Sequence, residues 1–86
     1  MKILKSFFGE VFLIEIFNQN DKRGKFLKLF NSRIFKQKIK NNFIVREAFL
    51  SNSAKGTIRG MHYDTLVTKN NKLIYCNKGK IFDVVL

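Results

Sequence analysis

The sequence predicts a mainly β fold of antiparallel strands with one short helix. Short apolar runs rich in Phe, Ile and Val alternate with clusters of polar turn residues at close spacing, which is typical of a chain of strands. The length of 86 residues allows one small domain with a modest core. Ten Phe and a hydrophobic fraction of 45% exclude the class of disordered chains.

The expected elements follow the runs in chain order. Asn31 and Ser32 can cap a short helix over Arg33–Lys40, and Asn41 and Asn42 would end it. A turn cluster is expected over Asn18–Arg23, before Gly24. The expected strands are Val11–Phe17, Lys25–Phe30, Phe43–Leu50, Thr57–Tyr63, Lys72–Cys76 and Lys80–Leu86, with further turns at Ser51–Gly56 and Asn77–Gly79 and a loop at Thr65–Asn71.

The composition also excludes several classes of protein. One cysteine, Cys76, cannot form a disulfide within the chain, and a lone thiol favours a reducing compartment. Every long apolar run is broken by charge, so we expect no membrane-spanning segment. Glu10 and Glu15 interrupt the apolar stretch that follows Lys2 and Lys5, which argues against a signal peptide.

The last expected strand stops at Val84-Val85-Leu86, in the middle of an apolar run. Native C-termini are usually polar and frayed, and an uncovered terminal strand would be an aggregation edge. We therefore expect a truncated chain, either a fragment or a shortened gene product. The alternative is an inner strand that simply ends within a sheet.

The net charge of +11 suggests an anionic partner or a solvated basic surface. Between residues 22 and 46 nine basic residues and no acid interleave with four Phe, which is typical of a phosphate-binding face with aromatics for base stacking. No nucleic-acid motif accompanies the charge, so we favour a solvated surface over a Phe core and expect no nucleic-acid partner. A small basic nucleic-acid-binding module remains the alternative. The apolar positions of Phe26–Ile39 are too irregular for a membrane-surface helix, and we expect no membrane partner.

The densest chemical signal is the segment Lys55–Tyr63, which holds the only histidine, His62. Lys72 opens the next expected strand, and two adjacent strands could bring both side chains to one cavity. Histidine suits proton transfer near neutral pH, and lysine suits stabilisation of a developing oxyanion. The plain alternative is a half-buried polar histidine in a strand.

Strand parity limits this site. Arg59 and His62 are three residues apart, so a regular strand places them on opposite faces. A bulge at Gly60 would bring both inward.

The sequence contains no pattern typical of a metal site, a glycine-rich nucleotide-binding loop or a Ser-His-Asp catalytic site. One His, one Cys and scattered carboxylates give no metal-ligand spacing. Gly56-x-x-x-Gly60 is neither a Walker nor a Rossmann pattern. One histidine without a nucleophile elbow does not make a Ser-His-Asp site.

From about Gly9 to Leu86 the sequence resembles the dTDP-4-dehydrorhamnose 3,5-epimerases and related dTDP-sugar 3-epimerases. Asp21-Lys22-Arg23-Gly24-Lys25-Phe26 is similar to the D-x-R-G-x-F turn of that family. Lys55-Gly56-Thr57-Ile58-Arg59-Gly60-Met61-His62-Tyr63 is similar to its K-G-[VT]-[LI]-R-G-[LM]-H-[YF] segment. Lys72-Leu73-Ile74, then Gly79 and Phe82-Asp83-Val84-Val85, resembles its K-L-[VI] … G-x-[VI]-x-D-V-V run.

The resemblance implies a cupin-like fold, with residues 1–86 as a single incomplete domain and a partial double-sheet jelly roll. It implies an isomerase of dTDP-rhamnose biosynthesis that removes a proton beside the 4-keto group of a dTDP-4-keto-6-deoxy sugar nucleotide. The implied catalytic residues are His62, as the base, and Lys72, which steadies the enolate oxygen. The implied substrate-binding residues are Arg23, Phe26, Glu47 and Arg59, with the two arginines contacting the nucleotide diphosphate and the substrate.

The resemblance further implies a cytoplasmic homodimer formed by strand exchange through the Arg23 region, with no metal and no organic cofactor. Family members are much longer, and their second half carries the tyrosine acid and the aspartate that orients the histidine. Lys28 stands where many members have an acidic nucleotide contact, and Glu47 and Phe49 stand where many have amides. We therefore expect these 86 residues alone to be inactive. An inactive partner subunit of a full-length epimerase is a further alternative.

Overall fold

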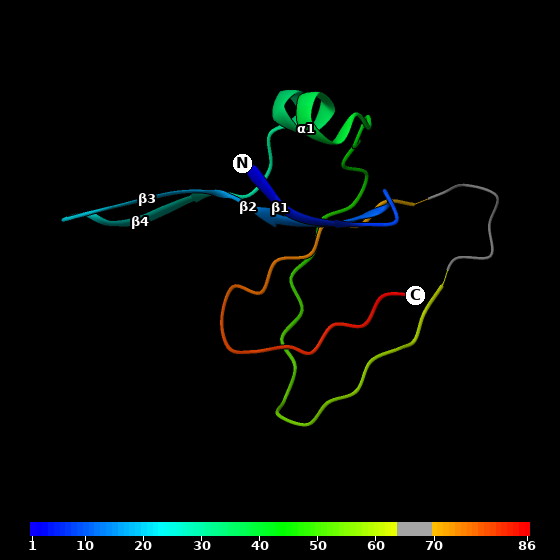
Figure 1. The fold of residues 1–86 in the computed structure, drawn as a ribbon. Helices are drawn as coiled ribbons and strands as arrows, with labels where there is room; N and C mark the ends of the chain where they lie inside the picture. The colour runs from blue at the N-terminus through cyan, green and yellow to red at the C-terminus, as the bar shows by residue number, and fades with distance from the viewer. Residues whose placement is uncertain (64–69) are drawn as a thin grey trace. The chain divides into compact units, whose positions relative to one another are not determined.

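The protein is described by a computed structural model that covers residues 1–63 and 70–86 (Figure 1). The described residues form mainly antiparallel strands in two small sheets with one short helix, which confirms the predicted class and is consistent with a partial cupin-like β fold. They divide into two units, Met1–Ile44 and Val45–Leu86. Each unit is described by itself below, and the single domain over residues 1–86 stays a prediction.

The first unit begins with a hairpin of β1 (Lys2–Phe7) and β2 (Val11–Glu15). The strands pair from Lys2 opposite Glu15 to Phe7 opposite Val11, with a shift of register between Ile3 and Lys5. β1 is not among the predicted strands, because its apolar residues do not alternate with polar ones. This strand forms instead because it pairs with the apolar strand β2.

The turn of this hairpin places a phenylalanine in a strained backbone conformation. Phe8 and Gly9 have φ angles of 54° and 69°, and the Glu10 N–H donates to the Phe7 carbonyl at 3.1 Å. Positive φ at both central residues is the geometry of a type I′ turn, which strongly prefers Asn-Gly. Phe8 is 98% exposed, so no packing compensates the strain.

Replacing Phe8 by asparagine is therefore expected to stabilise the hairpin by about 1 kcal/mol, since asparagine tolerates positive φ better than phenylalanine. Urea denaturation of the chain measures the change in the free energy of unfolding. The matched control is Phe82→Asn, which removes an aromatic ring of 94% exposure and should change that free energy little. An equal change in the two variants would contradict the turn assignment.

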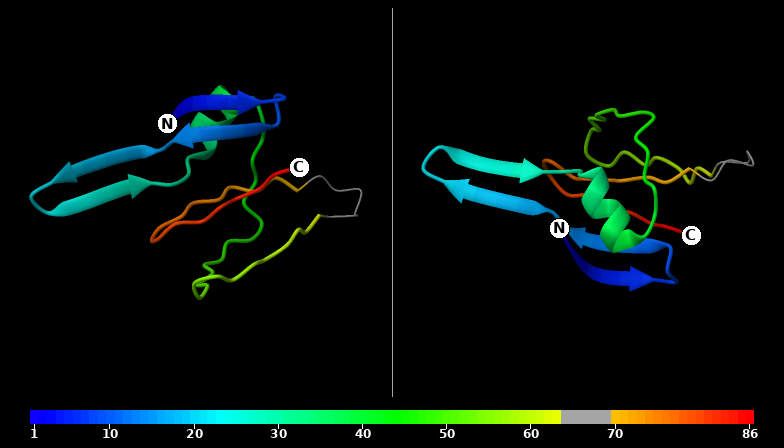
Figure 2. Two further views of the ribbon diagram at one scale, coloured as in Figure 1. Left: turned by 60° about the horizontal axis from the view of Figure 1, so that its bottom comes forward. Right: turned by 90° about the horizontal axis from the view of Figure 1, so that it is seen from above.

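A second hairpin consists of β3 (Phe17–Asp21) and β4 (Gly24–Lys28), joined by a two-residue loop, Lys22-Arg23. Phe17 pairs with Lys28 and Asp21 with Gly24. Nearly every residue of the two strands is exposed, and both views of Figure 2 show the hairpin extending away from the rest of the first unit. Neither of its faces is covered within this unit.

The helix α1 (Ser32–Ile39) lies close to its predicted range. The Asn31 side chain accepts a hydrogen bond from the Ile34 N–H at 3.1 Å, which confirms the predicted cap. The helix ends at Lys40, which adopts the left-handed conformation at φ 57° and ψ 29°, one residue before the predicted Asn41.

The helix carries the core of the first unit. Phe35, only 4% exposed, is the one buried hydrophobic residue in the described structure. Its ring contacts those of Phe30 and Phe43, with centroids 4.9 Å and 5.7 Å away, and Phe30 and Phe43 lie 5.5 Å apart. Part of the predicted Phe core is therefore present as a three-ring cluster.

Two predicted boundaries in the first unit are wrong. The expected strand Val11–Phe17 is divided at Ile16 into β2 and β3. The expected turn Asn18–Arg23 is mostly strand, because Asn18–Asp21 pairs with Gly24–Leu27 and only Lys22-Arg23 turns. Polar turn-forming residues are tolerated in this strand because both of its faces are exposed. The expected strand Lys25–Phe30 is confirmed over most of its length as β4.

The second unit, as far as it is described, contains no helix or strand. The expected strands Phe43–Leu50, Thr57–Tyr63, Lys72–Cys76 and Lys80–Leu86 are therefore not formed, and their described residues beyond Phe43 are exposed. A strand requires a hydrogen-bonded neighbour, and these segments pair with none in the described structure. The expected turn at Ser51–Gly56 is found at its end, where the Thr57 N–H donates to the Ala54 carbonyl at 3.2 Å. The expected loop Thr65–Asn71 lies largely outside the described residues.

Candidate functional site

The predicted site residue Arg23 lies at the tip of the β3–β4 hairpin. The Asp21 carboxylate accepts a hydrogen bond from the Arg23 N–H at 2.8 Å and from its Nη2 at 2.7 Å. The first of these bonds closes an Asx turn, and Gly24 continues the chain at φ 124°. The D-x-R-G pattern thus has a local structural cause in this hairpin. The Arg23 side chain remains 87% exposed and can still meet an anion.

This pair makes the turn sensitive to acid. The Arg23 side chain, and then its backbone N–H, hold the pKa of Asp21 below its ordinary value of 3.8. The Asp21 carboxylate in turn raises the pKa of Arg23. A carboxyl whose pKa is lower in the folded state stabilises that state above its unfolded pKa. That stabilisation is lost as the pH falls through the folded pKa.

Acidification below pH 3.8 is therefore expected to loosen the β3–β4 turn. An NMR titration that follows the Asp21 carboxyl carbon and the Arg23 Nε measures both partners. Asp21→Asn keeps an oxygen acceptor for the Arg23 N–H but removes the titrating charge, so its turn should show no such transition. A transition at the same pH in this variant would contradict the role of Asp21.

Phe26, the second predicted substrate contact in this hairpin, is 58% exposed on β4. Its ring meets that of Phe17 edge to face, with centroids 6.5 Å apart. The Lys28 Nζ lies 5.7 Å from the Phe17 centroid. The hairpin therefore presents an exposed aromatic pair with basic groups beside it.

His62 and Arg59 lie in the second unit, in a segment without regular secondary structure. Gly60 has a φ of 104°, a conformation that residues with a side chain rarely adopt, and a Cβ built on it would be in ordinary van der Waals contact with the His62 Nδ1 at 3.6 Å. The Arg59 Nε donates to the Ser53 Oγ at 3.0 Å. No strand forms here, so the predicted bulge at Gly60 stays untested.

Lys72 and Glu47 are also exposed residues of the second unit. No ion pair or hydrogen bond between described residues joins Lys72, Glu47 and His62 to one another. The geometry of the described residues therefore brings Arg23 and Phe26 into one hairpin and leaves the imidazole and the ammonium group as separate exposed groups.

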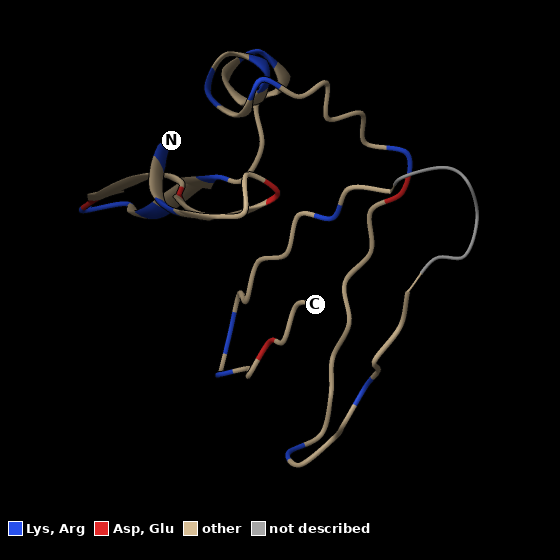
Figure 3. Ribbon diagram, turned by 45° about the vertical axis from the view of Figure 1, so that its right-hand side comes forward, with Lys and Arg blue, Asp and Glu red and all other residues tan. Residues whose placement is uncertain are grey.

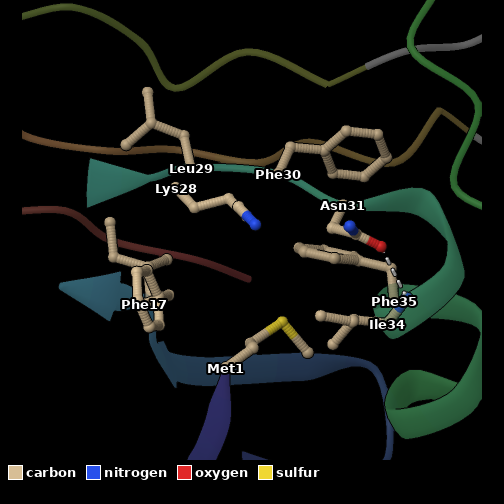
Figure 4. Close-up of a pocket in the computed structure, with 9 residues that line it drawn as sticks. Met1, Phe17, Lys28, Leu29, Phe30, Asn31, Ile34 and Phe35 are labelled. Carbon is tan, nitrogen blue, oxygen red and sulfur yellow. Dashed lines mark hydrogen bonds between the residues drawn. The ribbon is translucent and has the colours of Figure 1, made fainter. Parts of the chain in front are cut away.

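Residues of the first unit line two hollows. The first has a volume of about 20 Å³, which holds about one water molecule and no sugar nucleotide. Figure 4 shows it between the start of the chain, Phe17, Lys28 and the helix, with the Asn31 cap at its rim. The second, of about 430 Å³, lies beside α1. Neither contains His62 or Lys72.

The structure gives specific neighbours to one residue that the sequence did not single out, Ser53, and to three that it identified only in part, Gly60, Arg33 and Lys36. The Ser53 hydroxyl accepts a hydrogen bond from Arg59, and no sequence signal identifies it. Gly60 lies next to His62, and the R-G-x-H spacing points to it. Arg33 and Lys36 line the second hollow, and their spacing of three residues on a helix could have indicated a shared face.

Two features are absent from the described residues. No helix among them is long and apolar enough to cross a membrane. No three His, Cys, Asp or Glu side chains gather there into a cluster that could hold a metal ion.

Comparison with known proteins gives a consistent result. A sequence model of the family described as dTDP-4-dehydrorhamnose 3,5-epimerase matches residues 6–86. Over all 86 residues the chain is 30% identical to a Shigella flexneri protein of that name and 36% identical to one from Neisseria gonorrhoeae. Over 66 residues the chain is 33% identical to a dTDP-4-dehydrorhamnose 3-epimerase of Streptomyces niveus. The aligned segment covers 77% of the chain and 32% of that relative.

The chain spans about half the length of the curated relatives it matches, or less. It covers 48% of the Shigella protein and 26% of the Neisseria protein. No solved structure matches the chain.

Proposed function

Because this chain belongs to the dTDP-4-dehydrorhamnose 3,5-epimerase family, we propose that it epimerises, or forms the part of an enzyme that epimerises, a dTDP-4-keto-6-deoxyhexose at C3, C5 or both. The observation that carries the proposal is the family match over residues 6–86, which contains the segment Arg59-Gly60-Met61-His62 and, ten residues after His62, Lys72. The reaction class is proton abstraction beside a carbonyl.

In the proposed reaction the His62 imidazole takes a proton from the carbon beside the ketone. The electron pair of that C–H bond moves into a C–C double bond, and the ketone oxygen becomes an enolate oxygen. The Lys72 ammonium group donates a hydrogen bond to this oxygen and compensates its charge. Return of a proton to the opposite face completes inversion, whereas return to the same face regenerates the substrate.

The nucleotide is proposed to bind through arginine and aromatic groups. Arg23 and Arg59 pair with diphosphate oxygens, since the planar guanidinium matches phosphate geometry. The exposure of Arg23 supports this role, because its ion pair with Asp21 leaves most of the side chain open. Phe26 and Glu47 contact the nucleoside. The lone exposed thiol of Cys76 fits the reducing environment of the cytoplasm, where we place the protein.

Deuterium exchange tests the proposal most directly, because exchange requires only the base and the enolate stabiliser, whereas inversion also requires an acid on the other face. The chain is incubated with dTDP-4-keto-6-deoxyglucose in D₂O, and loss of the C3 and C5 proton signals is followed by NMR. dTDP-glucose is the control, since without a ketone its C–H bonds are not acidified. No exchange above the protein-free blank would overturn the first form of the proposal, in which this chain itself removes the proton.

We also propose a homodimer that exchanges the β3–β4 hairpin between subunits. The support is a hairpin whose strands are exposed on both faces, with Phe17 and Phe26 largely open to solvent. Exposed aromatic rings of this kind stabilise interfaces when buried.

Phe26→Ser should therefore shift the chain from dimer toward monomer at a given concentration, as measured by light scattering after size exclusion. Phe82→Ser, which removes an equally apolar exposed ring from the second unit, is the matched control. A monomeric unmodified chain, or equal dissociation of both variants, would contradict hairpin exchange.

A further inference from the structure

The second hollow of the first unit is large enough for a small organic ligand. It is an open hollow with a volume of about 430 Å³, and five of its six lining residues are exposed. It is lined by two basic, two neutral polar and two apolar residues: Arg33, Lys36, Ser32, Asn42, Phe43 and Ile44. None of these six residues has a part in the proposed epimerase site.

The charge in this hollow is not neutralised by the protein. Arg33 and Lys36 are three residues apart on α1, so they share one face, and like charges at this spacing repel. No ion pair involves either residue in the described part of the chain, and no acidic residue occurs between positions 22 and 46. Figure 3 shows Lys and Arg on the helix and no acidic residue there. The hollow therefore offers two free positive charges.

The donors at this hollow suit a phosphate group. The Arg33 guanidinium presents a planar fork of N–H donors, and the Lys36 ammonium adds a compact charge. The Ser32 hydroxyl and the Asn42 amide are neutral donors lining the same space. A phosphate, with several acceptor oxygens and up to two negative charges, can use all of them.

The remaining wall is apolar, and one of its two side chains, Phe43, packs against other rings. The Phe43 ring is half-buried, with centroid distances of 5.5 Å and 5.7 Å to the rings of Phe30 and Phe35. Ile44 is exposed beside it. This wall would cover an aromatic or apolar part of a ligand next to its charged end.

We propose that this hollow binds a small phosphorylated molecule, with its phosphate at Arg33 and Lys36 and its aromatic part against Phe43 and Ile44. The chemical class is an aromatic phosphate monoester, such as a nucleoside monophosphate. This site shares no residue with the proposed sugar-nucleotide site, and it stands or falls independently of the epimerase activity.

Binding is tested on the full chain with adenosine 5′-monophosphate, whose base differs from that of the proposed substrate. Amide NMR shifts map the contact, and titration gives the dissociation constant. Arg33→Gln combined with Lys36→Gln should weaken binding at least about tenfold, since two charge-assisted hydrogen bonds are lost. Lys38→Gln is the matched control, because Lys38 lies on the same helix, carries the same charge as Lys36 and does not line the hollow.

The proposal is supported if shifts concentrate on the lining residues, the double variant loses affinity and Lys38→Gln keeps it within about twofold. Adenosine without phosphate should bind at least about tenfold more weakly than the monophosphate, because it cannot engage the two cations. Three results would overturn the site: no shift at the lining residues, equal binding of adenosine, or an equal loss in Lys38→Gln, which would mean attraction of any anion to the basic segment. Glutamine has high helix propensity, and circular dichroism verifies that α1 persists in each variant.

Discussion

Replacing His62 by alanine is expected to lower the rate of deuterium exchange at C3 and C5 of the keto sugar by about 10²–10⁴-fold, the usual contribution of a positioned general base. The imidazole is the only one in the chain, so no second histidine can take over. Its exposure in the described residues leaves it accessible to a substrate. The enolate cannot form at an appreciable rate unless a base accepts the proton.

Two companion variants separate chemistry from structure in this experiment. His62→Gln keeps a side chain of similar size that cannot act as a base near neutral pH, and its exchange rate should fall as far as that of His62→Ala. Tyr63→Phe changes the adjacent exposed residue and should leave the rate nearly unchanged. Exchange that survives both substitutions of His62 would dismiss this residue as the base.

Local interactions explain which parts of the fold could be predicted. The helix was predictable because its cap and its end are encoded by neighbours in sequence: Asn31 bonds to Ile34, and the chain turns at Lys40. The tip of the second hairpin was predictable in part for the same reason, since Asp21 and Arg23 are two residues apart.

Non-local pairing explains what could not be predicted. The polar segment Asn18–Asp21 has turn-forming composition, and its strand conformation depends on pairing with Gly24–Leu27. β1 likewise depends on β2. The expected strands of the second unit have suitable β propensity, but propensity alone does not form a strand without a partner.

The candidate site residues likewise divide into those that a local sequence pattern predicts and those that it does not. The D-x-R-G pattern and the R-G-x-H pattern identified Arg23 and His62, and the structure accounts for the first through an Asx turn. The hollow beside α1 was not predicted, because Arg33 and Lys36 come from the helix whereas Asn42, Phe43 and Ile44 come from the segment after it. Such a site depends on the path that residues 42–44 take beside the helix, and no local sequence pattern predicts this path.

Replacing Lys72 by methionine is expected to lower the same exchange rate by about 10²–10³-fold, the effect of removing one oxyanion donor. Methionine preserves much of the length of the side chain and removes its charge, so the change measures what the positive charge contributes to the rate. Lys72→Arg keeps a positive charge but changes its shape, and it should retain more activity than Lys72→Met.

The control for Lys72 must separate a specific ammonium group from the general basicity of a chain with a net charge of +11. Lys80→Met removes an exposed lysine from the same unit and should leave the rate within about twofold, since a solvated charge several residues away is screened. If Lys72→Met and Lys80→Met lower the rate equally, the effect of Lys72 is attraction of the anionic nucleotide. If only Lys72→Met lowers it at saturating substrate, the ammonium group acts on the enolate, because saturation removes any difference in binding.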